Sequence, residues 1–492
     1  MSTPAKRVMI LSAGVGSGHN AAANALEAEF ARIPDVEAVS SVDVLDLTND
    51  LFRTLNDDAY FGLVDAAPWL VGWGYDMMDV PFRSKGAMSA WDQLNTTRVV
   101  RAIRDFEADT IVCTHFLPAR VVSLLLGRGR LQATMSVVTT DYDFQGMWLT
   151  APFNRFYVAR DETRAHMVEI GLPADRITVS GIPVKEGFSA PVDRDSVLAR
   201  YDLRPDVPIL LISAGAAGGE YTKAAVTQTL AIRNPFQAVV VCGRNEHLRE
   251  EVVALVASSP DRYRVVGYTT EMAALMRAAT LFVGKPGGLS SSECMAAGLP
   301  MVLINPIPGQ EVRNSDFLLE EGAAVRCNYT TTIGYKVAML LAAPDRLARM
   351  KANAHRVGRV DAAAVIASGA LAQTSQLAWI SREAQRVIRD RVQQGLSART
   401  RSAGGKVETV VEVSTGVSVA LVTQSDLRRI ASLLPRGVSL PELRVTPELI
   451  THLRRRRLTA DAVAVLDNAL GAAEEVVLKV QGGETAEVAI RP

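Results

Sequence analysis

The chain has 492 residues, 48% of them hydrophobic, and its 53 basic residues balance 53 acidic ones. This length exceeds what one hydrophobic core supports, so two or three domains are expected. A net charge of zero gives no reason to expect nucleic acid or a strongly acidic partner. The four cysteines lie far apart and form no CxxC pair, which fits a reducing compartment and excludes an obvious zinc site.

The start of the chain does not have the pattern of a signal peptide. Met1-Ser-Thr-Pro leads through Lys6 and Arg7 into a short apolar strand. No run of the chain approaches the ~20 apolar residues of a membrane span. We therefore expect a cytoplasmic protein, one that can still contact the cytoplasmic face of a membrane.

The first part of the chain alternates predicted strands with helices. A strand over 7–12 breaks at Gly14, Gly16 and Gly18, and a helix follows from about 20 to 31. Further strands are predicted over 39–45, 110–114, 137–140 and 156–158. This alternation is typical of a parallel, doubly wound sheet with helices on both faces.

The pattern restarts with a strand over 207–213, which again ends in glycines, at Gly215, Gly218 and Gly219. Strands are then predicted over 238–242, 264–266, 281–283 and 301–304. The sequence therefore predicts two α/β domains, 1–185 and 186–375. Ligands of such sheets bind at the carboxyl ends of the strands, which favours a site between the two domains.

The alternation of strands and helices ends at about residue 376. A helical stretch leads to a Gly/Ser/Arg-rich linker over 395–405, then to strand-like segments over 406–413 and 417–422, and to a final hairpin over 476–490. We predict a small accessory α+β domain over 376–492 and assign it no role.

The stretch from Gly284 to Asn314 is the most informative of the chain. Gly287 and Gly288 lie where a buried strand gives way to a helix, followed by Ser290, Ser291 and Ser292 at the expected helix start. Free N–H groups and the helix dipole favour an anion there. Glu293, expected in the first turn, can accept hydrogen bonds from ribose hydroxyls. The alternative is a tight turn with serine caps and no ligand.

The first glycine loop has two functional interpretations. His19 follows Gly18 at a helix start, which disfavours the protonated imidazole and suits a general base for an acceptor hydroxyl. Alternatively, the three glycines bind a dinucleotide, with Asp43 at the spacing of a ribose-binding acid. A histidine that only caps or packs is the third possibility.

Four blocks of the sequence resemble one enzyme family. They are residues 12–26 (SAGVGSGHNAAANAL), 138–148 (VTTDYDFQGMW), 179–184 (VSGIPV) and 285–314 (KPGG through PGQEVRN). Over residues 7–375 the chain resembles glycosyltransferases of the monogalactosyldiacylglycerol synthase and processive diacylglycerol glucosyltransferase group, which is related to MurG-type enzymes. The region after 376 is not covered.

The resemblance implies a GT-B fold, two Rossmann-like domains with the acceptor in the first and the donor nucleotide in the second. It implies an inverting transfer of a hexose from UDP-glucose or UDP-galactose to a lipid such as diacylglycerol, with no tightly bound metal or other cofactor. Two alternatives stay open: a dinucleotide-dependent oxidoreductase, and a GT-B-like binding protein without turnover.

The resemblance also assigns residues to roles. His19 is the implied catalytic base, and Asp141 orients or replaces it. The implied donor-binding residues are Gly215, Gly218, Tyr268, Gly287, Gly288, Ser290, Ser291, Glu293, Gln310, Glu311 and Asn314. The implied acceptor-binding residues are Gly16, Gly18, Gln145 and Trp148. Gln145 departs from the family, which usually has a histidine there; glutamine can hydrogen-bond an acceptor but cannot take its proton.

Three further features are ambiguous. Asp141-Tyr-Asp143 spells a metal-binding D-x-D, but an extended segment would send its carboxylates to opposite faces. The aromatic, glycine-interrupted stretch Ala66–Phe82 fits either a loop at a bilayer interface or core packing. The run Arg454–Arg457 fits either a solvated helix face or contact with anionic lipid.

Overall fold

The structure is a computed structural model that describes residues 5–14, 18–47, 79–82, 87–213, 215, 219–381, 384–393, 417–422, 475–480 and 488–490. The chain divides into two compact units, Met1–Gln385 and Arg386–Pro492. Among the described residues, no helix is both long enough and apolar enough to cross a bilayer.

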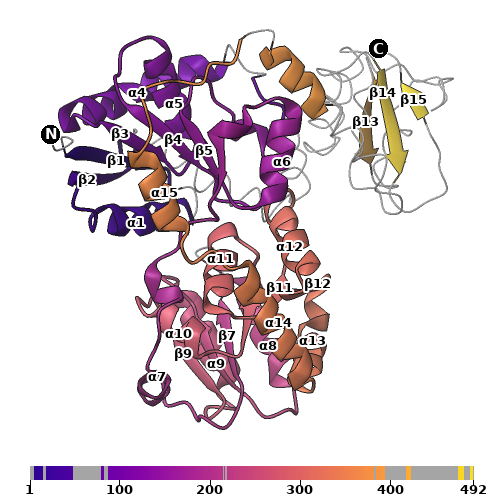
Figure 1. Cartoon of the computed structure of the whole chain (residues 1–492). Coiled ribbons are helices and arrows are strands. Elements are labelled where there is room, and N and C mark those ends of the chain that lie inside the picture. The colour runs from indigo at the N-terminus through magenta and orange to yellow at the C-terminus, as the bar shows by residue number, and fades with distance from the viewer. Residues whose placement is uncertain are drawn as a thin grey trace. The chain divides into compact units, whose positions relative to one another are not determined.

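The first unit begins with a six-stranded parallel sheet in the order β2-β1-β3-β4-β5-β6 (Figure 1). Its strands are β1 (Lys6–Ser12), β2 (Val36–Asp43), β3 (Thr110–Cys113), β4 (Thr134–Val138), β5 (Arg155–Val158) and β6 (Ile177–Val179). The connecting helices include α1 (Gly18–Phe30), α4 (Ala87–Phe106), α5 (Phe116–Gly127) and α6 (Asp161–Ile170). The continuous apolar runs of β1 and β3 are buried because helices cover both faces of a parallel sheet.

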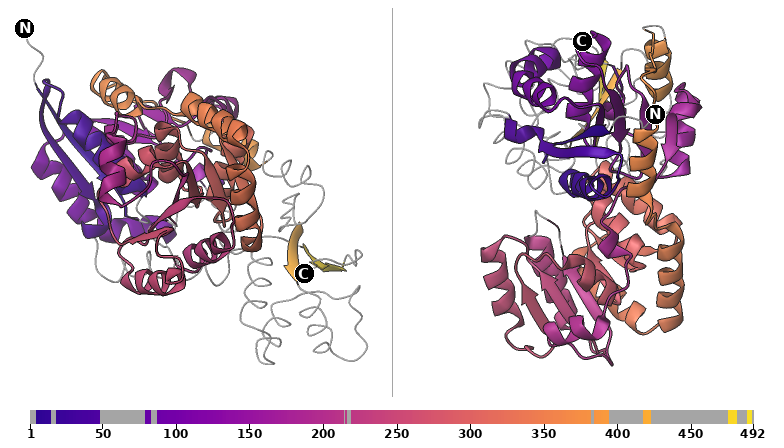
Figure 2. Two further views of the ribbon diagram at one scale, coloured as in Figure 1. Left: turned by 90° about the horizontal axis from the view of Figure 1, so that it is seen from below. Right: turned by 60° about the vertical axis from the view of Figure 1, so that its left-hand side comes forward.

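A second six-stranded parallel sheet follows in the same unit, in the order β12-β11-β10-β7-β8-β9. Figure 2 shows the chain from two further directions. Its strands are β7 (Ile209–Ser213), β8 (Gln237–Val241), β9 (Tyr263–Val266), β10 (Leu281–Gly284), β11 (Met301–Ile304) and β12 (Ala324–Cys327). Its helices include α7 (Arg194–Arg200), α8 (Glu220–Leu230), α9 (Glu246–Val256), α10 (Met272–Ala278), α11 (Gly288–Ala297), α12 (Gln310–Glu320), α13 (Ile333–Leu341) and α14 (Pro344–Val357). The predicted fold of two Rossmann-like domains is confirmed; the sequence prediction missed β6 and β12.

The strand order of the second sheet locates its ligand site. Read from β9, the order is 3-2-1-4-5-6, which reverses direction between β7 and β10. In open α/β sheets, ligands bind outside the carboxyl ends of the strands at this reversal. The loops that follow β7 and β10 hold Gly215 and Gly287, two of the predicted donor-binding residues.

After the second sheet the chain returns to the first. Helix α15 (Ala362–Leu371) lies beside α1, and its Ile366 and Ala370 share a core with Ile10 and Phe30 (Figure 1). The segment that follows continues the attachment: the Gln373 side chain donates to Ser136 Oγ (2.8 Å), and the backbone of Ala378 pairs with that of Phe153. The domain boundaries predicted at 185 and 375 stay predictions.

The second unit contains a small sheet of β13 (Val417–Val422), β14 (Glu475–Val480) and β15 (Val488–Ile490). The pairs are β13–β14 parallel and β14–β15 antiparallel, so the two strands of the predicted final hairpin do pair. The predicted strand over 406–413, the run Arg454–Arg457 and nearly all of the aromatic stretch before Phe82 lie outside the described residues.

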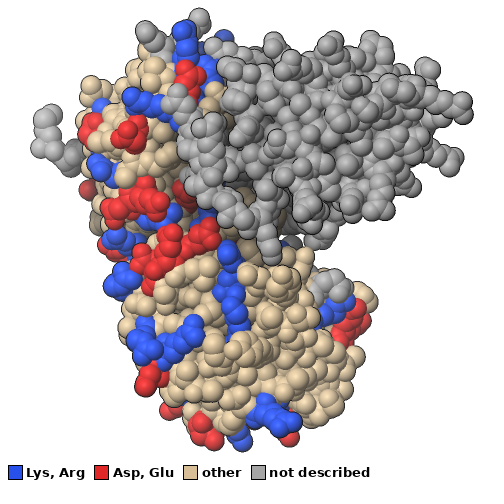
Figure 3. Space-filling model, turned by 90° about the vertical axis from the view of Figure 1, so that its right-hand side faces the viewer, with Lys and Arg blue, Asp and Glu red and all other residues tan. Residues whose placement is uncertain are grey.

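Figure 3 shows one face of the molecule, on which Lys and Arg are interspersed with Asp and Glu over the described surface. This mixture agrees with the zero net charge of the sequence.

Candidate active site

The first glycine loop is held from inside by Asp43, at the end of β2. The carboxylate of Asp43 accepts from the backbone N–H of Gly14 (3.1 Å), from Asn20 Nδ2 (2.8 Å) and from the backbone N–H of Leu45 (3.0 Å). A Cβ atom at Gly14 would lie 2.4 Å from Asp43 Oδ2, so a larger residue there would have to displace this carboxylate. The acid that the dinucleotide interpretation needs for a ribose is therefore engaged with the protein itself. Gly16 lies outside the described residues.

His19, in the first turn of α1, has one defined tautomer. Its Nδ1 lies 3.0 Å from the carbonyl oxygen of Thr114 and 2.9 Å from Thr140 Oγ1. A carbonyl oxygen only accepts hydrogen bonds, so Nδ1 carries the proton and Nε2 carries the lone pair. Burial lowers the pKa of His19 to about 4, opposed by the bond to Thr114 and by the charge of Asp43. The imidazole is thus neutral at pH 7, as predicted, although burial is the larger cause.

The residues around His19 follow the ends of neighbouring strands. Thr114 comes directly after β3, and Thr140 lies two residues beyond the end of β4. The carboxyl ends of parallel strands share one edge of a sheet, which explains why these positions meet. The sequence prediction missed both threonines, although Thr140 stands next to the predicted Asp141.

The segment predicted to bind the donor forms the expected strand, glycine turn and helix. β10 ends at Gly284, and α11 begins at Gly288 with Gly287 as its N-cap and no side chain capping it. Glu293 lies in the second turn, not the first, because the helix begins at Gly288, earlier than a start capped by the serines would place it. Burial raises the pKa of Glu293 to about 8, and Lys185 opposes the rise. Ser290 is half-buried, and the buried Ser291 Oγ has no hydrogen-bond partner among the described atoms.

Gly288 brings the two halves of the first unit into direct contact. A Cβ atom at this position would lie 1.9 Å from the carbonyl oxygen of Thr140 and 3.2 Å from Asp141 Oδ1. On the other side of the contact, a Cβ at Gly18 would meet the Leu289 side chain at 3.6 Å. The start of α11 therefore packs against the loop that carries Asp141 and against the first glycine loop.

Asp141 joins the predicted catalytic and donor-binding residues. Its carboxylate accepts from Gln310 Nε2 (2.5 Å) and from Asn314 Nδ2 (3.1 Å), both on α12. The backbone N–H of Tyr142 donates in turn to Asn314 Oδ1 (2.9 Å). Burial raises the pKa of Asp141, and the two amide bonds oppose the rise. Glu311 accepts from the backbone N–H of Ile307 (2.7 Å), which shapes the loop before α12, and its other oxygen faces Gly287.

Arg313 forms a second link between the halves, one that the sequence analysis did not identify. Its guanidinium lies 3.0 Å from Asp79 Oδ2 and 3.4 Å from Asp143 Oδ2, and it donates to the carbonyl oxygen of Phe144 (3.1 Å). The side chains of Arg313 and Asp79 are 14% and 5% exposed, so the pair is largely shielded from water. The carboxylates of Asp141 and Asp143 thus have separate protein partners.

The remaining predicted residues differ in exposure. Tyr268 is 62% exposed, with the Arg244 guanidinium 4.7 Å from its ring centroid, so it is not a core aromatic. Gly215 has a left-handed backbone (φ +72°) and open space around it. Gln145 and Trp148 are 2% and 3% exposed, and Gln145 caps the 3-10 helix Gly146–Trp148. Their role as acceptor contacts stays a prediction, and Gly218 lies outside the described residues.

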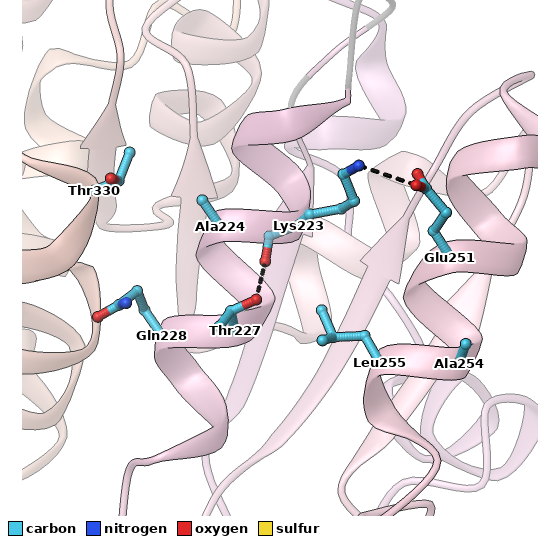
Figure 4. A pocket seen from close by; sticks show the side chains of 8 residues that line it. All are labelled: Lys223, Ala224, Thr227, Gln228, Glu251, Ala254, Leu255 and Thr330. Atoms are coloured by element: carbon cyan, nitrogen blue, oxygen red, sulfur yellow. Dashed lines mark hydrogen bonds and ion pairs between the residues drawn. The ribbon is translucent and has the colours of Figure 1, made fainter.

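A separate surface groove lies over α8 and α9 (Figure 4). Its lining includes Lys223, whose Nζ lies 3.0 Å from Glu251 Oε1, and Thr330 beside α13. It contains none of the site residues predicted from the sequence.

Two regions of the chain match known protein families, one region for each sheet. Residues 19–184 match the monogalactosyldiacylglycerol (MGDG) synthase family, and residues 210–366 match the glycosyltransferase family 28 C-terminal domain. A processive diacylglycerol beta-glucosyltransferase of Bacillus subtilis (strain 168) is 29% identical over 76% of this chain and 96% of its own. Its counterpart in Bacillus licheniformis is 29% identical over 71% of this chain and 90% of its own.

Solved structures show the same architecture. The S. aureus MnaA–UDP co-structure superposes with a TM-score of 0.51 at 14% identity, over 73% of this chain and 94% of that one. A putative UDP-N-acetylglucosamine 2-epimerase from Listeria monocytogenes gives a TM-score of 0.50, also at 14% identity, over 74% and 95%. These likenesses establish the GT-B fold, and the two matched domains establish the family. The chain therefore belongs to the glycosyltransferases that join a monogalactosyldiacylglycerol synthase domain to a glycosyltransferase family 28 C-terminal domain.

Proposed function

We propose that the protein is an inverting hexosyltransferase that moves a sugar from a UDP-hexose to diacylglycerol at the cytoplasmic face of a membrane. The observation that carries the proposal is the meeting of His19, with its unprotonated Nε2, and the start of α11, through Gly18, Leu289, Thr140 and Gly288. The named activity of the Bacillus relatives supports diacylglycerol as acceptor and makes glucose the favoured sugar.

The donor binds across the carboxyl ends of the second sheet. The uncapped N-terminus of α11 offers N–H groups to the diphosphate, and Ser290 and Ser291 add hydroxyl donors. Burial raises the pKa of Glu293, and hydrogen bonds donated by the ribose hydroxyls would stabilise its carboxylate. Exposed Tyr268, two residues beyond the end of β9, stacks on the base.

The chemistry is a single displacement. The acceptor hydroxyl oxygen attacks the anomeric carbon while the bond from that carbon to the diphosphate oxygen breaks. The hydroxyl proton passes to Nε2 of His19, and the Nδ1–H bond to the Thr114 carbonyl holds the ring as its charge develops. The helix dipole and N–H groups of α11 stabilise the negative charge that builds on the departing diphosphate.

Asp141 supports this step through the protein. Its bonds to Gln310 and Asn314 place the two α12 side chains that the resemblance assigns to the donor sugar. Asp141 thereby couples the acceptor half to the sugar-binding end of the donor half. The proton itself goes to His19, because both oxygens of Asp141 already accept bonds from the amides.

The test is product analysis with purified protein. Diacylglycerol vesicles are incubated with UDP-glucose, UDP-galactose, UDP-N-acetylglucosamine or GDP-glucose, and lipid products are identified by mass. We expect a hexosyl-diacylglycerol from a UDP-hexose, and a loss of about 10²- to 10⁴-fold in His19→Ala. His247→Ala is the matched control, since that side chain is 83% exposed on α9. Formation of no glycolipid from any donor would contradict the proposed transfer, and an active His19→Ala would contradict the assigned base.

A further inference from the structure

A second histidine lies against the proposed base. His115 follows Thr114, whose carbonyl binds His19, and it is the N-cap of α5. Its Nδ1 accepts a hydrogen bond from the backbone N–H of Leu117 (3.1 Å), so Nδ1 carries no proton. The ring is therefore held in one orientation by the start of a helix, and its exposed fraction is 2%.

The two histidine rings meet edge to face. Their centroids are 4.5 Å apart and their planes are inclined at 87°. The ring centroid of Phe116 lies 4.2 Å from that of His115, and the ring centroid of Trp148 lies 6.2 Å from that of each histidine. These aromatic groups form a cage around one side of His19, and His115 is the member that contacts it most closely.

The cage opposes a charge on either histidine. Burial and the neighbouring His19 lower the pKa of His115 well below its ordinary value. Among the described residues, Asp43 is the charged group whose field acts on His19 and favours its protonated form. Burial outweighs that field. Anything that opens the cage to water would therefore weaken the effect that keeps His19 neutral.

We propose that His115 is a positioning residue for His19: its helix-capped ring fixes the plane of the His19 imidazole and keeps water from that side of it. The inference rests on the proposed function, in which His19 takes the acceptor proton. His115 itself does not touch the substrate in this role. It acts by keeping His19 neutral, so that the lone pair of Nε2 can accept the proton of the acceptor hydroxyl.

Two substitutions test separately the two roles of the His115 side chain, the aromatic ring against His19 and the cap of α5. His115→Asn keeps the cap, because an asparagine oxygen accepts from the helix start, but it removes the ring. His115→Phe keeps a ring against His19 and loses the cap. We expect the acid limb of kcat/KM to move to higher pH in His115→Asn and to stay near the wild-type position in His115→Phe. A return of the His19 pKa to its ordinary 6.5 would lower activity about fourfold between pH 8 and pH 6.

The His19 pKa can also be measured without catalysis. The chain has six histidines, so an NMR titration of protein labelled at histidine resolves few signals, and His19→Ala assigns the one of interest. His247→Asn is the control and should leave both the signal and the activity unchanged. Thermal melting shows whether each variant is folded.

The outcomes are distinct. An acid limb and a His19 titration that stay at the wild-type position in His115→Asn would overturn the positioning role, even where activity falls. If His19→Ala were fully active, the proposed base would fail, and the NMR titration would still decide whether His115 controls the His19 pKa. If His115→Asn does not fold, a limb that moves in His115→Phe would contradict the role of the ring.

Discussion

The contact between Gly288 and Thr140 gives a quantitative test of how closely the two halves must meet. In Gly288→Ala the new Cβ would lie 1.9 Å from the Thr140 carbonyl oxygen, and real Cβ atoms essentially never approach within 3.0 Å. The donor helix and the acceptor half must therefore separate by about 1.1 Å. A misplacement of about 1 Å costs on the order of 100-fold in rate, or about 2.7 kcal/mol of the activation barrier. We expect kcat to fall by this order while each half stays folded.

The assay is the rate of glycolipid formation at saturating UDP-hexose, with a thermal melt to confirm folding. Gly287→Ala is the adjacent comparison, because a Cβ there meets nothing nearer than Glu311 Oε1 at 3.8 Å. Its backbone (φ −63°) also suits alanine, so it should leave the contact between the halves intact. A wild-type kcat in Gly288→Ala would refute the reasoning, because it would mean that the halves need not meet here.

Three further predictions follow from the site. The free energy of unfolding of the wild type should fall as pH drops from about 6.5 to about 4, because His19 takes up a proton at higher pH in the unfolded chain than in the folded one. Urea unfolding of His19→Ala should lack this part of the pH dependence, and an identical pH profile in the variant would contradict the prediction. Arg313→Ala should lower the free energy of unfolding by about 3 to 5 kcal/mol, since it leaves Asp79 and Asp143 without their buried partner; an unchanged urea midpoint would argue against the link. Tyr268→Ala should raise the KM for the UDP-sugar and leave the melting temperature unchanged, whereas Tyr268→Phe should behave as wild type; equal KM values would exclude base stacking.

Local patterns predicted much of the fold. The apolar runs that end in glycines at Gly14, Gly215 and Gly287 correspond to β1, β7 and β10, because a buried parallel strand followed by a tight turn leaves a strong signal. The missed strands β6 and β12 lie at sheet edges and have three and four residues. Such short edge strands contribute few apolar positions, and only pairing with a neighbour identifies them.

The motifs indicated members of the candidate site but not which of them would meet. His19, Asp141 and Gln310 all stand in matched blocks, yet nothing along the chain pairs Asp141 with Gln310, or His19 with Thr114, which follows another strand. Arg313 lies inside the matched block, yet nothing in its neighbours along the chain indicates that Asp79 would face it. Contacts between the two halves depend on how the two sheets are placed, and the periodicity of the sequence contains no information about that placement.

The return of α15 to the first sheet has a consequence for synthesis. The core around Ile10 and Phe30 is complete only when residues 362–371 have joined it, whereas every strand of the second sheet is made by Cys327. A ribosome adds about 5 to 20 residues per second, so roughly 10 to 40 seconds pass between the synthesis of β6, the last strand of the first sheet, and that of α15. The half that is translated first is thus finished last, and a fragment that ends before α15 would expose the apolar surface that this helix covers.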